Sequence, residues 1–118
     1  ERRLWGRGNG DSEVDQMVRT CPILAEYAGW ARGERLGYCT HGHVWNRENL
    51  PPLRPGDLLL HGHTHVPAWT NIGQWNLYLN PGSVSLPKES TAHSYMTLEG
   101  STACWKTMEG VCYHQLQL

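Results

Sequence analysis

The stretch LLLHGHTHVP at residues 58–67 joins an apolar run to a turn that carries two histidines. Residues 57–60 predict a short strand of the kind that is buried on both faces of a sheet. His63 and His65 share a parity, so an extended backbone would direct both imidazoles to one face. Gly62 has no Cβ, which lets the backbone turn sharply or lie close to a ligand. His61 has the same parity but lies inside the strand, where we expect it to pack or pair.

Two other segments carry side chains that can bind metals. The sequence His41-Gly42-His43 ends a second apolar run, and Arg7-Gly8-Asn9-Gly10-Asp11 offers an amide oxygen and a carboxylate on a loop. Neutral imidazole binds divalent Mn, Fe, Co, Ni or Zn, and an amide oxygen adds a harder ligand. One strand-end histidine is usually structural, but three such segments in order predict a metal centre.

Short strands dominate the rest of the chain. Asp11 or Ser12 can cap a short helix that ends at Pro22, and Asn46 can cap a second helix within residues 46–53. The turn signals predict a hairpin over residues 24–40, a second hairpin around residues 71–73, and a final meander. The expected strands span residues 24–32, 35–40, 67–70, 75–79, 95–98, 103–106 and 111–118, with a tight turn at 80–83.

Composition limits the function classes. The 118 residues fit a single domain, residues 1–118, and the net charge of −1 gives no electrostatic case for binding nucleic acid or an anionic membrane. We find neither a membrane span nor the apolar core of a signal peptide. We therefore expect a cytoplasmic location.

The four cysteines, Cys21, Cys39, Cys104 and Cys112, form no CxxC motif. Cys104 and Cys112 flank a predicted turn and can face each other across a hairpin. Free buried thiols in a reducing compartment are the favoured interpretation.

The three histidine and asparagine segments resemble the C-terminal motifs of calcineurin-like metallophosphoesterases, and most of all the small bacterial YfcE-type phosphodiesterases. The likeness covers residues 6–98 and includes Glu48-Asn49-Leu50-Pro51 and Asn80-Pro81-Gly82-Ser83-Val84-Ser85. It implies the C-terminal part of a two-sheet α/β sandwich, with mixed or antiparallel strands, short helices, and metals in loops at one sheet edge.

The resemblance also implies roles for individual residues. Asn9, His41 and His63 correspond to ligands of one metal ion, and His65 to a ligand of the other. Asp11 would hold a ligand or the loop by hydrogen bonds. Substrate contact is a further implied role, for His43, Asn80 and Ser83. A structural role also suits His43, and a plain turn also suits residues 80–83.

The implied activity is hydrolysis of a small phosphodiester by metal-activated water. Manganese is the expected metal, with zinc, iron, nickel or cobalt as other candidates. The family's Asp-x-His and Gly-Asp motifs are not in this sequence, and Gly10 stands where many relatives have a histidine. We therefore expect one bound ion instead of two, and weak or absent hydrolysis by this chain alone.

Other interpretations stay open at this point. The chain can be a partial copy of an enzyme, a piece that pairs with an N-terminal half in trans or with its own copies, or a remodelled domain. The main alternative function is a non-catalytic protein-interaction module on the same scaffold. A third is a domain whose histidines are vestigial.

Overall fold

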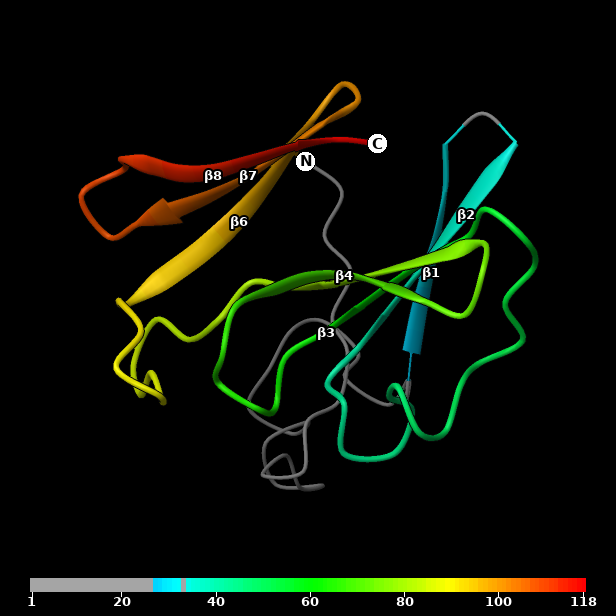
Figure 1. Cartoon of the computed structure of the whole chain (residues 1–118), viewed down its shortest axis with the longest axis horizontal. Helices are drawn as coiled ribbons and strands as arrows, with labels where there is room; N and C mark the ends of the chain where they lie inside the picture. The colour runs from blue at the N-terminus through cyan, green and yellow to red at the C-terminus, as the bar shows by residue number, and fades with distance from the viewer. Residues whose placement is uncertain (1–26, 33) are drawn as a thin grey trace, which may run out of the picture.

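Two β-sheets make up the computed structural model, which describes residues 27–32 and 34–118 (Figure 1). The five-stranded sheet has the order β1-β2-β3-β5-β4, and the three-stranded sheet has the order β6-β7-β8. The strands are β1 (Tyr27–Arg32), β2 (Arg35–Thr40), β3 (Leu58–His61), β4 (Ala68–Ile72), β5 (Asn76–Asn80), β6 (Ser94–Glu99), β7 (Thr102–Thr107) and β8 (Cys112–Gln117).

The three inner strands of the larger sheet are parallel. Thr40 at the end of β2 pairs with His61 at the end of β3, and Leu60 of β3 pairs with Leu79 of β5. The outer strands β1 and β4 are antiparallel to their neighbours. Consequently β2, β3 and β5 all end at the same edge of the sheet, and the loops that follow them lie together.

The apolar run at residues 58–60 forms β3, the central strand, as predicted. Leu58 and Leu59 are buried, and His61 at the end of the strand is only 4% exposed. A strand with neighbours on both sides and cover on both faces has little room for polar side chains, which explains the continuous apolar run.

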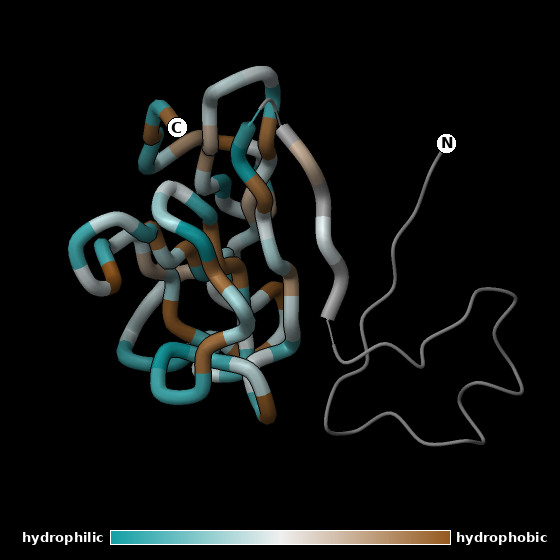
Figure 2. The backbone as a smooth tube through the Cα atoms, turned by 90° about the vertical axis from the view of Figure 1, so that its right-hand side faces the viewer, coloured by the Kyte–Doolittle hydropathy of each residue, from teal (hydrophilic) through white to brown (hydrophobic). Residues whose placement is uncertain are grey.

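The smaller sheet packs against the larger one through a shared core. Leu79 of β5 clusters with Ala103 and Trp105 of β7, and all three are fully buried. The indole Nε1 of Trp105 donates a hydrogen bond to the backbone oxygen of Asn80 at 2.7 Å. Figure 2 shows hydrophobic segments in the interior between the two sheets.

The predicted hairpins and the final meander are confirmed. β1 pairs with β2, β4 with β5, and β6, β7 and β8 pair in sequence. The part of the first strand before residue 27 and the helix expected after residue 11 lie outside the described residues. Within the described part of the chain, no helix is long and apolar enough to cross a membrane.

The helix predicted at residues 46–53 is wrong: this segment is a loop. Asn46 does form the expected cap, because its side-chain oxygen accepts hydrogen bonds from the backbone N–H groups of Glu48 and Asn49. Pro51 follows too soon for a helix, since it disfavours helical backbone at Leu50 and leaves about one turn between cap and stop. The cap therefore closes an Asx turn.

Candidate metal centre

The candidate site lies at the edge where the three parallel strands end. The loop after β2 carries His41 and His43, the loop after β3 carries His63 and His65, and the loop after β5 begins at Pro81. Loops at the carboxyl ends of parallel strands are the usual location of ligand sites in such sheets. The strand pairing alone thus brings together segments that are separated by about twenty residues in the sequence.

His41 and His63 come closest to forming a ligand pair. The Nε2 atom of His41 lies 3.2 Å from the Nδ1 atom of His63, and the ring centroids are 5.0 Å apart. A metal ion bound about 2.1 Å from two imidazole nitrogens holds them about 3.0 Å apart at a right angle and about 3.4 Å apart at a tetrahedral angle. The two nitrogens are within hydrogen-bond distance in this structure, and their separation lies between these two values.

His65 points to a different partner. Its Nδ1 lies 2.6 Å from the carbonyl oxygen of Leu86, in the loop after β5. If this nitrogen carries the proton, Nε2 is free to act as a ligand or a base. His65 thus has one nitrogen fixed by the backbone, an arrangement typical of metal-binding histidines.

The argument from extended-strand parity is wrong for this pair. β3 ends at His61, and both His63 (φ 64°) and His65 (φ 62°) adopt left-handed backbone conformations. Non-glycine residues adopt this conformation uncommonly, and such strain concentrates at functional sites. The turn places the two imidazoles against different partners, consistent with the separate metals that the family resemblance implies.

The glycine on which the site depends is Gly42, not Gly62 as we expected. Gly42 has φ +111°, and a Cβ there would lie 2.7 Å from Nδ1 of His61 and 3.1 Å from the Cβ of His63. A Cβ on Gly62 would meet only the backbone oxygen of His41, at 3.9 Å. Gly42 therefore allows the two histidine loops to approach each other.

His43 lies near the pair but farther from it. Its ring centroid is 5.2 Å from that of His41 and 6.5 Å from that of His63. Across residues 27–32 and 34–118, no three His, Cys, Asp or Glu side chains are grouped closely enough to hold a metal ion. Asn9 and Asp11 lie outside the described residues, so their roles stay predictions.

The side chain of Asn80 holds the turn that carries His63 and His65 through hydrogen bonds. Its side-chain nitrogen, which has two protons to donate, lies within hydrogen-bond distance of three oxygens: the carbonyl of Gly62 at 3.1 Å and the hydroxyls of Thr64 and Tyr78 at 2.9 and 2.8 Å. Its side-chain oxygen accepts from the N–H of Gly82 at 2.9 Å. Asn80 is fully buried, and its side chain positions the turn; a substrate contact by the backbone of this residue stays a prediction.

Ser83 does lie beside the histidines. A cleft of about 330 Å³ is lined by His41, His63 and His65 together with Pro81, Ser83, Val84 and Tyr95. The Ser83 hydroxyl accepts a hydrogen bond from the N–H of Leu86 at 3.0 Å, which still leaves its own proton available. A substrate role for Ser83 stays a prediction that this position permits.

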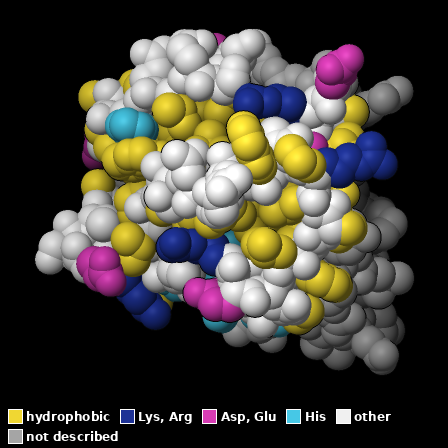
Figure 3. Space-filling model, turned by 45° about the vertical axis from the view of Figure 1, so that its right-hand side comes forward, with side chains coloured by type: hydrophobic (Ala, Val, Ile, Leu, Met, Phe, Trp, Pro, Cys, Tyr) yellow, Lys and Arg dark blue, Asp and Glu magenta, His cyan; other side chains and the backbone are white. Residues whose placement is uncertain are grey.

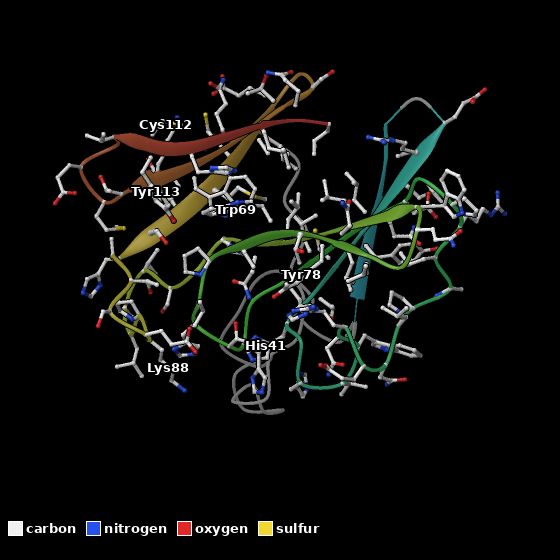
Figure 4. All side chains as sticks on the ribbon, viewed as in Figure 1. His41, Trp69, Tyr78, Lys88, Cys112 and Tyr113 are labelled. Carbon is white, nitrogen blue, oxygen red and sulfur yellow. The ribbon has the colours of Figure 1, made fainter. Side chains whose placement is uncertain are left out.

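A buried pair of rings, His61 and Tyr78, lies next to the histidine loops. The rings of His61 and Tyr78 lie 4.4 Å apart beneath the loops, and Figure 4 shows Tyr78 on the same side of the sheet as His41. Burial lowers the pKa of His61, so its imidazole is neutral near pH 7, and burial raises the pKa of Tyr78. Sequence parity grouped His61 with the other histidines, but it did not reveal that Tyr78 stacks on it.

Comparisons with known proteins agree with this architecture. A family model described as a calcineurin-like phosphoesterase superfamily domain matches residues 6–103. The phosphodiesterase YfcE of Escherichia coli K12 is 44% identical over 93 residues, which cover 79% of this chain and 50% of the relative. The YfcE proteins of strains O6:H1 and O157:H7 match to the same extent. The chain thus spans about half the length of these curated relatives.

Solved structures match as well. The structure of YfcE from E. coli, a phosphoesterase, has a TM-score of 0.89 at 36% identity, covering 97% of this chain and 63% of that one. A predicted phosphoesterase from Streptococcus pneumoniae has a TM-score of 0.57 at 22% identity, over 80% of this chain and 63% of that one, which supports the fold alone. The expected two-sheet α/β sandwich is thereby confirmed.

Proposed function

The chain belongs to the calcineurin-like phosphoesterase superfamily, and from this membership we propose that its histidine loops serve metal-dependent hydrolysis of a small phosphodiester. The observation that supports this most is the 3.2 Å approach of His41 Nε2 to His63 Nδ1 at the edge where three parallel strands end. Two imidazole nitrogens facing each other at this distance suit a shared divalent cation.

Each residue has a defined part in this proposal. His41 and His63 hold one ion together with Asn9, and Asp11 steadies the Asn9 loop. His65 is the one ligand that this chain offers to a second ion, too few to hold that ion tightly. We propose manganese as the ion because the family resemblance implies it; the amide oxygen of Asn9 suits manganese, whereas the imidazoles also suit zinc, iron or nickel. A bound divalent ion lowers the pKa of a water molecule and offsets charge on phosphoryl oxygens.

The remaining groups would orient the substrate and the loops. Asn80 keeps the His63 turn in place through its hydrogen bonds to Gly62 and Thr64. The cleft beside the histidines gives a phosphodiester a route to them, and Ser83 is among the residues that line it. In this proposal His43, 5.2 Å from His41 between ring centroids, contacts a phosphoryl oxygen of the substrate.

Titration of the metal-free chain with Mn²⁺ in a calorimeter tests the proposal. We expect binding of one ion, weakened by roughly tenfold or more in His63→Ala because one of few ligands is lost. His93→Gln is the matched control, since His93 is an exposed histidine outside the pair. Failure of the wild-type chain to bind Mn²⁺ or Zn²⁺ would refute the site.

Hydrolysis of bis(4-nitrophenyl) phosphate provides the second readout. We expect weak or absent hydrolysis by this chain alone. Any rate should be removed by chelator and by His63→Ala and retained in His93→Gln. A rate that survives chelator would contradict metal dependence.

Exposed apolar side chains favour one other function, that of a protein-interaction module. Trp75, Leu86 and Val111 are 69%, 60% and 62% exposed, and Figure 3 shows hydrophobic side chains across one face. Binding of a partner that persists in chelator would support this second candidate, whereas the enzyme would lose activity.

A further inference from the structure

Two cysteines share the outer face of the smaller sheet because of a β-bulge. Cys104 of β7 lies opposite Gln115, and its sequence neighbours Ala103 and Trp105 point into the core, so Cys104 points outward. In a regular ladder this register would pair Cys112 with Thr107 and direct it inward. The register shift beside Trp105 and Lys106 instead pairs Cys112 with Lys106. The bulge therefore turns Cys112 to the face of Cys104.

The two thiols are in contact on this face. The Sγ atoms of Cys112 and Cys104 are within hydrogen-bond distance, 3.0 Å apart, and the Cys112 sulfur also lies 3.3 Å from the carbonyl oxygen of His114. A disulfide bond is about 2.05 Å long, so the sulfurs need to move only about 1 Å closer. Cys112 is exposed and Cys104 is partly buried. Figure 4 shows Cys112 on β8, at the side of the smaller sheet away from the larger one.

We propose that Cys104 and Cys112 form a reversible redox pair that becomes an intramolecular disulfide when it meets a low-molecular-weight disulfide such as oxidised glutathione. The exposed thiolate of Cys112 attacks one sulfur of the reagent, breaks its S–S bond and releases one thiol. The thiolate of Cys104 then attacks the sulfur of Cys112 and releases the second thiol. Two protein thiols are oxidised and one reagent disulfide is reduced to two thiols, so electrons and protons balance.

The order of attack follows from the surroundings of the two sulfurs. The contact with Cys112 raises the pKa of the Cys104 thiol, which keeps Cys104 protonated to higher pH. Cys112 is also the more exposed of the two. It is therefore the sulfur that a reagent in solution reaches first.

Oxidation would stiffen β8, the strand of the smaller sheet that contacts the larger sheet at this side. β8 is the edge strand, and its His114 ring stacks on Trp69 of β4, with centroids 3.7 Å apart and an interplanar angle of 12°. A disulfide between β7 and β8 would tie this edge strand to its neighbour two residues before His114. We expect slower fraying of β8 and a firmer stack between His114 and Trp69.

Peptide mapping tests whether the bond forms. The full chain is incubated with reduced and with oxidised glutathione, blocked with an alkylating reagent and digested with trypsin, which cuts after Lys88 and Lys106. We expect residues 89–106 linked to 107–118 only in the oxidised sample, and reversal of the link by reduced glutathione. A link to Cys21 or Cys39, a link between two chains, or no link at all would each overturn the proposal.

Thermal unfolding tests the effect on the strand. Oxidation should raise Tm of the wild type by several degrees, because a crosslink restricts the unfolded chain. Cys112→Ser should lose this shift. Cys39→Ser, which removes a partly buried thiol of β2 outside the pair, should keep it. Linked peptides without a rise in Tm, or a rise that persists in Cys112→Ser, would overturn the stiffening of β8.

Discussion

Cys39 shows how the surroundings of one residue make the fold sensitive to pH. It lies on β2, inside the larger sheet, and burial raises the pKa of its thiol from 9.0 to about 11. The unfolded chain loses this proton near pH 9, while the folded chain keeps it to about pH 11. The folded state therefore loses stability relative to the unfolded state as the pH rises through this window.

We expect this single group to lower the free energy of unfolding by about 1–2 kcal/mol between pH 8.5 and 11, allowing for its partial exposure. Urea unfolding at a series of pH values measures the effect under reducing conditions. Cys39→Ala should have a flatter stability profile in this window, whereas Trp75→Phe, a change at an exposed side chain that carries no thiol, should keep the wild-type slope. Equal slopes for wild type and Cys39→Ala would show that burial of this thiol has no such effect.

At the scale of single residues, the sequence identified the candidate ligand histidines but not the residues that position their loops. His41, His63 and His65 stand out because imidazoles beside glycines at strand ends are a chemical pattern. Asn80 was predicted as part of a turn, and its side chain does accept from the N–H of Gly82. Its donor bonds to Gly62 and Thr64 cross from β5 to the loop after β3, and such contacts cannot be predicted before the strand order is known.

The loop after β2 controls how closely the histidine loops approach. Gly42→Ala would place a Cβ 2.7 Å from Nδ1 of His61 at a φ of +111°. His61 is buried, so the ring cannot move away easily. We expect a loss of about 2–4 kcal/mol of stability together with weaker Mn²⁺ binding, because the loops of His41 and His63 would separate.

Gly110→Ala is the matched control for this substitution. Gly110 also has a positive φ, +86°, but a Cβ there meets no atom within 4 Å. Backbone strain alone should cost about 1–2 kcal/mol at Gly110, without an effect on Mn²⁺ binding. Urea unfolding and calorimetry on both variants separate the two contributions. Similar losses in both, with Mn²⁺ binding unchanged, would contradict a steric role for Gly42.

Strands were predictable at the element scale, but their order was not. Alternation, apolar runs and turn residues are local signals, and they located the hairpins, the meander and the central strand at residues 58–61. The parallel pairing of β2, β3 and β5 depends on contacts between segments about twenty residues apart. The absence of the predicted helix at 46–53 has a local cause. Asn46 forms the predicted cap, but Pro51 disfavours helical backbone in the residue before it.

The whole molecule depends on the contact between its two sheets. Trp105 is fully buried between them, and its Nε1 donates to the backbone oxygen of Asn80 at 2.7 Å. Trp69 adds an edge-on ring contact to Trp105, with centroids 5.1 Å apart. The two-sheet arrangement was expected from the family resemblance alone, since strand periodicity does not say which faces will meet.

Trp105→Phe tests whether this contact holds the sheets together. The variant loses the indole N–H, leaves the Asn80 oxygen without that donor and opens space in the core. We expect a loss of about 2–3 kcal/mol. Trp75→Phe is the matched control, because Trp75 is 69% exposed, and it should stay within about 0.5 kcal/mol of wild type.

Urea unfolding followed by circular dichroism and by tryptophan fluorescence should give coincident transitions in both variants if the sheets unfold as one unit. A Trp105→Phe variant as stable as wild type would mean that the sheets are held together by the aliphatic side chains around Leu79 instead of by the indole.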